Sequence, residues 1–190
     1  MDVYFKKEIS YSFEGKNFTF DVGNTLFSTF DVDHGTDVLL RSIDIKKPKT
    51  ILDIGCGYGP IGIILAKKYV HSDVTLIDRD LLAVRYARHN AIKNGAPNVT
   101  VIGSVGMEQL AEQKFDLIVS NVPAKIGDEA IVEEFLLEPF SRLSVGGELW
   151  IVVVNGLNRL IPSAGRKHKI PLREVRKRNG HTVYTVKRIS

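Results

Sequence analysis

The chain has 190 residues, of which 44% are apolar and 25% are charged, and its net charge is +4. This length and balance are typical of one soluble globular domain and exclude a disordered chain. One cysteine, Cys56, excludes an internal disulfide and favours a cytoplasmic location, and no apolar run approaches the roughly twenty residues that cross a bilayer. We therefore expect one domain over residues 1–190, without a signal peptide or a membrane segment.

The first thirty residues are predicted to form a β-hairpin. Apolar Phe18, Phe20 and Val22 alternate with polar residues, and the turn-like pair Glu14-Gly15 precedes them. A short helix is then expected, marked by Val38, Leu39, Leu40 and Ile43.

Strands and helices alternate from residue 50 onward. Strands are expected at 50–54, 74–77, 99–102, 115–120 and 148–154, and helices at 60–69, 80–94 and 128–142. The strands that begin at Thr50, Phe115 and Glu148 are apolar almost throughout, which is typical of a parallel sheet covered by helices on both faces. The sequence therefore predicts an α/β fold.

The last thirty-five residues combine a hairpin signal with positive charge. Two alternating runs, 172–177 and 182–186, are joined through Asn179-Gly180, which indicates an antiparallel pair at the end of the sheet. From Gly156 onward ten basic residues face the single acid Glu174. Such a surface either keeps the protein soluble or binds phosphates.

Gly55, Gly57 and Gly59 lie between a predicted strand and a predicted helix, where a ligand can approach the backbone closely. Gly57, Gly59 and Gly62 also match the dinucleotide pattern G-x-G-x-x-G, and Asp78 lies at the next strand end, where it could bind a ribose. Spacing alone therefore leaves a dinucleotide and S-adenosylmethionine open.

Charge favours S-adenosylmethionine over a dinucleotide. Asp53 is expected near the mouth of the glycine loop, where its carboxylate would repel a pyrophosphate. S-adenosylmethionine has no phosphate, and its ammonium and sulfonium groups are cationic. The alternative is that the glycines only form a tight turn and Asp53 only caps neighbouring amides.

The run from Asp53 to Gly59, followed by Leu76-Ile77-Asp78, resembles motif I and the next acidic residue of class I methyltransferases. The resemblance covers nearly the whole chain and implies a Rossmann-like, mostly parallel sheet with one antiparallel strand near the C-terminus. It also implies that Asp78 binds the ribose of S-adenosylmethionine, and that the three glycines line its methionine and ribose part. Ser104 stands where the family usually has an acidic or polar group near the adenine amine.

Residues Asn121-Val122-Pro123-Ala124 follow the fourth strand of the alternating part and resemble the Asn-Pro-Pro-aromatic loop of methyltransferases that act on planar nitrogen groups. Asn121 and Pro123 match the loop, whereas Val122 and Ala124 depart from it. An exocyclic amine needs two acceptors that turn its lone pair toward the methyl group. The side-chain oxygen of Asn121 and the carbonyl of Val122 would be those acceptors, and Pro123 would stiffen the backbone. The alternative is a plain turn in which Asn121 caps amides.

The aromatic residue of that loop normally stacks on the target base, and Ala124 cannot do so. Phe27 and Phe30 are candidates to replace it. The segment Phe27-Ser28, followed by 33–36, is similar to the element before the fold in the small methyltransferase domain family, which includes guanine-N2 methyltransferases of ribosomal RNA. This resemblance implies that Gly35 and Thr36 close over the methionine end of the cofactor.

The leading hypothesis is an S-adenosylmethionine-dependent N-methyltransferase that acts on a guanine amine of ribosomal RNA. RNA contacts would come from this domain or from the partner in a homodimer. The alternatives are methylation of a protein or small-molecule nitrogen, and a catalytically silent RNA-binding module. No metal is expected, because His71, His89, His168 and His181 lack metal-ligand spacing.

Overall fold

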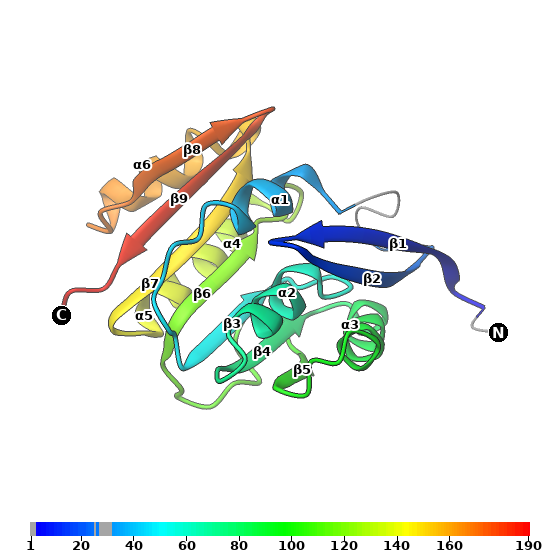
Figure 1. The fold of residues 1–190 in the computed structure, drawn as a ribbon. Helices are drawn as coiled ribbons and strands as arrows, with labels where there is room; N and C mark the ends of the chain where they lie inside the picture. Colours follow the sequence, from blue (N-terminus) through cyan, green and yellow to red (C-terminus); the bar gives the residue numbers. More distant parts are fainter. Residues whose placement is uncertain (1–2, 25, 27–31) are drawn as a thin grey trace.

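The central sheet of the computed structural model, which describes residues 3–24, 26 and 32–190, contains seven strands in the order β5-β4-β3-β6-β7-β9-β8. Their bounds are Thr50–Ile54 for β3, Asp73–Asp78 for β4, Val99–Gly103 for β5, Phe115–Asn121 for β6, Leu143–Val154 for β7, Arg173–Arg178 for β8 and His181–Lys187 for β9. Figure 1 shows them as one twisted layer.

Strand β9 is the one that runs against its neighbours. The pairs β3–β4, β3–β6, β4–β5 and β6–β7 are parallel, whereas β9 is antiparallel to both β7 and β8. Strand β8 therefore runs in the same direction as the parallel strands. The prediction of a mostly parallel sheet with a reversed strand near the C-terminus is confirmed.

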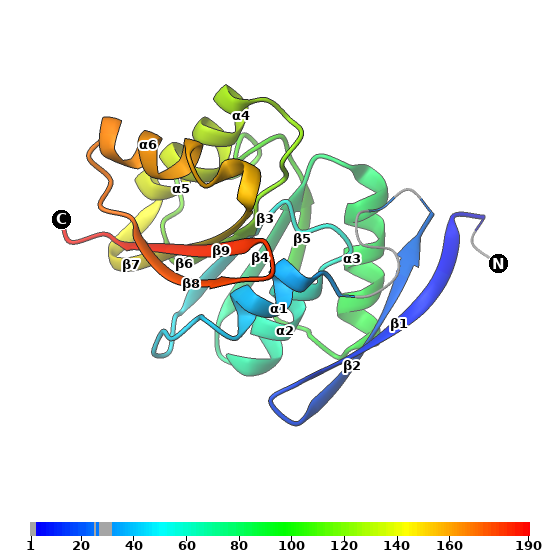
Figure 2. The same ribbon diagram turned by 90° about the horizontal axis from the view of Figure 1, so that it is seen from above.

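Helices cover both faces of this sheet (Figure 2). Helices α1 (His34–Leu40), α2 (Pro60–Lys68) and α3 (Leu81–Lys93) lie on one face, where they enclose a core with Leu76, Trp150 and Val183. On the other face lie α4 (Asp128–Val132), the π-helical turn η1 (Glu133–Leu137), α5 (Glu138–Ser141) and α6 (Leu160–Lys167), around a second core. Among the described residues, no helix has the length and apolar character that a membrane crossing requires.

The ends of the two predicted helices beside the glycine loop follow from their sequence. Gly59 caps α2 at φ +95°, and Pro60 takes the first helical position, where its missing N–H is not needed. Asp80 caps α3 and accepts a hydrogen bond from the backbone N–H of Leu82 at 2.8 Å. Gly95 follows the helix at φ +58°.

Several elements differ from the sequence-based expectation, among them the unpredicted 3-10 turn η2 (Asn155–Leu157). The helix predicted over 128–142 is interrupted by η1, which inserts one extra residue per turn. Strand β7 begins at Leu143, five residues before the predicted start, because Leu143 already pairs with Phe115. Helix α6 was not predicted. Pro162 and Gly165 are both unfavourable in a helix, and they interrupt the helical pattern of the apolar residues Ile161 and Ala164.

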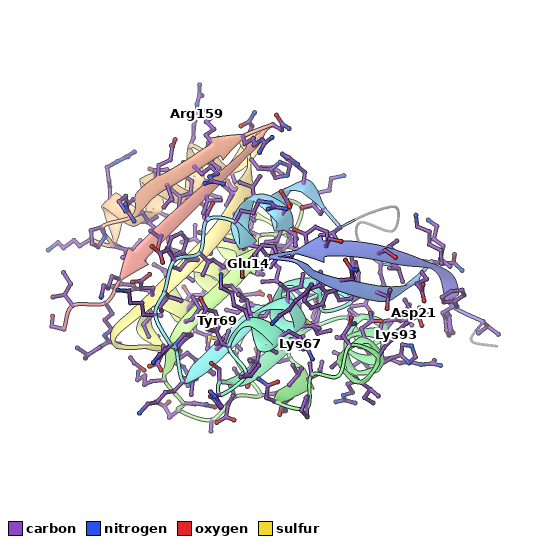
Figure 3. All side chains as sticks on the ribbon, in the orientation of Figure 1. Glu14, Asp21, Lys67, Tyr69, Lys93 and Arg159 are labelled. Atoms are coloured by element: carbon purple, nitrogen blue, oxygen red, sulfur yellow. The ribbon has the colours of Figure 1, made fainter. Side chains whose placement is uncertain are left out.

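The predicted N-terminal hairpin is confirmed as β1 (Phe5–Phe13) and β2 (Lys16–Gly23), and it lies beside α3 (Figure 1). Asn90 of α3 and Asn94, which follows the helix, bind the backbone of β2 as another strand would. Asn90 accepts from the N–H of Asp21 at 2.8 Å and donates to its carbonyl at 3.0 Å, and Asn94 does the same for Thr19 at 3.1 and 2.8 Å. Lys93 reaches Asp21 at 2.5 Å (Figure 3).

Candidate functional site

A cavity of about 540 Å³ lies at the carboxyl ends of the central parallel strands, the usual place for a ligand in an α/β sheet. Most of the residues predicted for the site line it: Thr36, Gly55, Gly57, Asp78, Ser104, Asn121, Val122 and Pro123. The predicted residues Gly35, Asp53 and Gly59 lie outside this lining. One cavity thus unites the end of β4, the glycine loop and the loop after β6.

The glycine loop and Asp78 hold one another in place. Gly55 and Gly57 have φ values of +67° and +56°, which glycine adopts without strain. The carboxylate of Asp78 accepts from the backbone N–H of Gly57 at 2.8 Å and from that of Asp80 at 2.9 Å. Apart from Gly57 itself and its two chain neighbours, no described residue has a heavy atom within 4 Å of a Cβ built on Gly57, so the backbone is open to a ligand on that side.

Gly59 and Gly62 serve packing instead of ligand approach. A Cβ on Gly59 would lie 2.8 Å from Cδ1 of Ile63, and a Cβ on Gly62 would lie 2.5 Å from Cδ1 of Leu76. Helix α2 can therefore approach β4 only because these positions have no side chain. Two of the three glycines that match the dinucleotide pattern, Gly59 and Gly62, are thus explained by packing, whereas Gly57 lines the cavity.

Asp53 lies beneath the glycine loop and is fully buried. One carboxylate oxygen accepts from the backbone N–H of Gly62 at 2.8 Å, and the other has no hydrogen-bond partner among the described residues. Burial, together with the nearby charge of Asp78, raises the pKa of Asp53 to about 7 despite the hydrogen bond from Gly62. This carboxylate was expected near the mouth of the loop, whereas the structure places it behind the loop, where it binds the start of α2.

Ser104 and Cys56 are buried at the edge of the cavity. The hydroxyl of Ser104 accepts from the backbone N–H of Gln109 at 3.2 Å, and its own N–H donates to the carbonyl of Asp78 at 2.9 Å. Burial raises the pKa of the Cys56 thiol well above its ordinary value, and the charges of Asp53 and Asp78 raise it further. The thiol therefore stays protonated at neutral pH and is a poor nucleophile.

Asn121, at the end of β6, is held by the start of α1. Its amide nitrogen donates to the carboxylate of Asp33 at 2.7 Å and to the hydroxyl of Thr36 at 3.2 Å. A carboxylate can only accept, so the NH₂ side of the amide must face Asp33. The amide oxygen is then the remaining polar atom of a side chain that lines the cavity, and it can accept from a ligand amine.

The next residues continue this wall. The backbone N–H of Val122 donates to the carbonyl of Val152 at 3.0 Å, which anchors the loop to β7. Val122 itself is buried, whereas Ala124 and Lys125 are exposed at the lip of the cavity. Anchoring by β7 and the fixed φ of Pro123 both restrict the direction of the Val122 carbonyl.

Some lining residues were missed by the sequence argument. Asp33 was considered only as part of a segment, yet it caps α1 and orients Asn121. His181 was considered only as a metal ligand and set aside, but it lines the cavity, and its ring lies 5.7 Å from that of His34. Gly35 fits between Asp33 and His181, because a Cβ on Gly35 would lie 2.8 Å from an atom of each side chain. The only sequence signal for the position of His181 was the Asn179-Gly180 turn, because it fixes where β9 begins.

The opposite wall comes from η1. Phe135 lines the cavity and lies 3.5 Å from a Cβ built on Gly55, and Glu134 receives two hydrogen bonds from Arg79, at 2.7 and 3.0 Å. The candidates Phe27, Ser28 and Phe30 lie outside the described residues. Within the described part of the chain, no cluster of three or more His, Cys, Asp or Glu side chains could hold a metal ion.

Comparisons with known proteins identify the relatives of the chain. Residues 17–185 match the family model of the methyltransferase small domain. The chain is 32% identical over 189 residues to the uncharacterized protein YbxB of Bacillus subtilis (strain 168), covering 97% of this chain and 92% of that protein. It is 35% identical over 140 residues to ribosomal RNA small subunit methyltransferase C of Hahella chejuensis, covering 72% of this chain but 39% of that protein.

A solved structure has the same fold. The 16S rRNA N2 G1207 methyltransferase of T. thermophilus, in complex with AdoMet and guanosine, superposes with a TM-score of 0.80 at 22% identity. The superposition covers 96% of this chain and 50% of that one. The chain therefore spans half or less of the two ribosomal RNA methyltransferases named above.

Proposed function

Because the chain belongs to the methyltransferase small domain family and is an S-adenosylmethionine-dependent methyltransferase, we propose that it methylates the exocyclic amine of a guanine in ribosomal RNA. The observation that carries the proposal is the fixed amide of Asn121, whose oxygen is left as an acceptor in the cavity. The names of the relatives support RNA as the substrate.

The family also decides between the two cofactors that glycine spacing left open. S-adenosylmethionine would supply, when bound, a sulfonium methyl group that a nitrogen lone pair can attack, with the neutral thioether as the leaving group. The open backbone at Gly57, the neighbouring Gly55 and the carboxylate of Asp78 would hold it. Ser104 would lie at the far edge, and Gly35 and Thr36 near the acceptor. Asp53 and Gly59 would support the loop from behind.

The chain's own residues would align the acceptor. A guanine amine is a weak nucleophile, because its lone pair is delocalised into the ring. The oxygen of Asn121 and the carbonyl of Val122 would each accept one of its hydrogens and so fix the direction of the lone pair. Asp33 and Thr36 hold the Asn121 amide in advance, so less ordering is needed at each turnover.

Val122 and Ala124 differ from the loop of related enzymes, and other methyl acceptors therefore compete with guanine. Ala124 offers no ring for a base to stack on, although Tyr58, Phe135 and His181 also line the cavity. A protein nitrogen, a small-molecule nitrogen and a silent RNA-binding module remain the competing functions. The basic surface near the C-terminus favours RNA over the first two.

The proposal is tested by incubating the protein with methyl-labelled S-adenosylmethionine and, in parallel, total RNA or total protein. We expect label in RNA, recovered as a methylated guanine after digestion. Label in protein alone would refute RNA as the substrate, and no label in either pool, with the cofactor bound, would favour the silent module.

An Asn121→Ala variant tests the catalytic assignment. We expect its kcat to fall about a hundredfold or more, because the amine loses one of the acceptors that align it. Cofactor affinity, measured by calorimetry, should change little. The matched control is Asn158→Ala, a change at an asparagine outside the cavity lining, which should keep full activity. Full activity of the Asn121 variant would contradict the role.

A further inference from the structure

We propose that Arg173, Arg176 and Arg178 of the edge strand β8 bind the sugar-phosphate backbone of RNA and guide it to the cavity. We call these three residues the arginine ladder. The inference rests on the proposed function and adds to it the surface on which the substrate docks.

Strand register places the three arginines on one face of the sheet. Arg173 pairs with Thr185, Arg176 with Val183 and Arg178 with His181, and these partners alternate along β9. Directly opposed residues point to the same face. A shift in register between Glu174 and Arg176 inserts one residue, which keeps Arg176 and Arg178 in phase with Arg173. Glu174 pairs with Tyr184 and therefore faces the other side.

That face is the one covered by α1. Val183 and Trp150, the partners of the ladder positions along β9 and β7, belong to the core under α1 to α3. Helix α1 packs over β7 and β9, and β8 lies beyond it at the rim of the sheet (Figure 2). The arginines are exposed, and the face they occupy continues from α1 to the edge of the molecule.

The ladder ends at the cavity. Arg178 is paired with His181, whose side chain lines the cavity and lies beside Asp33 and Gly35. Strand β8 runs in the same direction as the parallel strands, so its last residue lies at their carboxyl end, where Asn121 is found. A backbone that binds along Arg173, Arg176 and Arg178 would therefore arrive beside the proposed acceptor site.

These guanidinium groups have no protein partner among the described residues. Arg41, Arg79, Arg88, Arg142 and Arg188 all donate to carboxylates or carbonyls within the chain. None of the hydrogen bonds or ion pairs recorded for the described residues involves the ladder. Unpaired arginines on one strand face suit phosphate, which guanidinium binds through two parallel hydrogen bonds.

A simpler explanation is that basic residues on β8 only prevent edge-to-edge aggregation. That role would be filled equally well by basic residues on either face. The chain provides a matched comparison, because Arg166 and Lys167 on α6 and Lys177 on β8 are also exposed and basic. Lys177 pairs with Thr182 and so faces the α6 side. Removing three charges from each set separates location from net charge.

The test compares R173Q/R176Q/R178Q with R166Q/K167Q/K177Q. Binding of labelled, deproteinised small-subunit ribosomal RNA is measured between about 50 and 200 mM salt. We expect the slope of log Kd against log salt to fall by about 2 for the ladder variant, as loss of three phosphate contacts to single-stranded RNA predicts. The control variant should retain most of the slope. The KM for RNA should rise in the ladder variant, while cofactor affinity should stay unchanged in both.

Equal losses in the two variants would overturn the proposal in favour of non-specific charge, and native RNA affinity in the ladder variant would overturn it outright. Thermal unfolding establishes that each variant is folded. If the triple variant is not, the single changes R173Q and R178Q repeat the measurement. Failure of the proposed function is distinguishable, because the native protein would then transfer no methyl group to RNA whatever its affinity.

Discussion

At the scale of single residues, Asp53 makes the stability of the protein depend on pH. Its pKa is about 7 in the folded chain and near 3.8 in the unfolded chain. Between those values the folded state holds a proton that the unfolded state has lost, so this group's contribution to the free energy of unfolding falls as pH rises from about 4 to about 7. The total change is on the order of 4 kcal/mol.

An Asp53→Asn variant should not show this dependence. Urea unfolding of both proteins at pH 5 and pH 8 gives the difference in their free energies of unfolding. We expect the native protein to lose stability relative to the variant at pH 8. A difference that is the same at both pH values would show that the carboxylate is not titrating in this window.

Gly57 and Gly62 should respond differently to the same substitution. Gly62→Ala places a Cβ 2.5 Å from Leu76, and we expect it to reduce the free energy of unfolding by about 1–3 kcal/mol through overpacking. Gly57→Ala meets no atom within 4 Å, but its φ of +56° is unfavourable for alanine and its backbone lines the cavity. Its larger effect should be on cofactor affinity.

Urea unfolding and calorimetry with S-adenosylmethionine measure the two effects. The double variant Gly62→Ala/Leu76→Ala is the control for packing, since removing the clashing methyl groups should make the effects of the two changes less than additive. A Gly62→Ala variant as stable as the native protein would contradict the close approach of α2 to β4.

Residues that reach the cavity along their own strand could be predicted from the sequence. Asp78 and Asn121 follow apolar runs, and the carboxyl ends of parallel strands meet at one edge. His181 and Asp33 could not be predicted in this way. His181 enters the cavity because β9 pairs with β7, and Asp33 because it caps a helix that packs over the sheet. Both depend on contacts between segments far apart in the chain.

At the scale of elements, Asn90 joins the hairpin to the glycine loop. This fully buried side chain binds the backbone of Asp21 and also donates to the carbonyl of Tyr58 at 2.9 Å. Asn90→Ala would remove hydrogen bonds from the buried carbonyl of Tyr58 and from the partly buried backbone of Asp21, so we expect the free energy of unfolding to fall by about 3 kcal/mol. Cofactor affinity should fall as well, because Tyr58 lies between Gly57 and Gly59.

Asn94→Ala is the matched control, since Asn94 binds β2 in the same way but is partly exposed to water. Its effect on stability should be about 1 kcal/mol, and its effect on cofactor affinity small. Urea unfolding and calorimetry measure both. Equal effects of the two variants on cofactor affinity would show that the contact with Tyr58 does not position the loop.

Elements with regular periodicity were predictable, and those with altered periodicity were not. The alternation around Phe18 to Val22 and the apolar run at Thr50 gave β2 and β3 directly. The start of β7 at Leu143 includes Gly146 and Gly147, which interrupt any strand pattern. Phe135 and Leu136 of the π turn pack in the second core, and no local sequence pattern marks the turn.

At the scale of the whole molecule, the prediction of one domain can be tested by cooperative unfolding. Trp150, the single tryptophan, is buried in the middle of β7 and reports on the sheet by fluorescence. Far-UV circular dichroism reports on all helices and strands, including the hairpin. We expect the two signals to give coincident urea transitions, because Asn90 and Lys93 tie the hairpin to α3. Separate transitions would indicate a hairpin that unfolds independently.

Positive charge is distributed unevenly over the molecule, and the sequence shows this only as a number of basic residues near the C-terminus. Ten basic residues follow Gly156, but the strand register separates the arginine ladder from the basic residues of α6. Arg159 extends from the molecule near the start of α6 (Figure 3). Side chains alternate between the two faces of a strand, but the extra residue in β8 shifts this alternation. The sequence alone therefore does not show on which face of the sheet each basic residue lies.

Because of the π turn at Glu133–Leu137, the position of this cavity wall depends more on the number of residues in the helix than on their identity. One residue turns an α-helix by about 100°. Deleting a single residue from this turn would restore a regular helix and stabilise its backbone, yet it would rotate Phe135 and Glu134 away from Gly55 and Arg79. A change that improves the helix would thus remove one wall of the cavity, whereas substitutions at helix positions outside this wall would leave it in place.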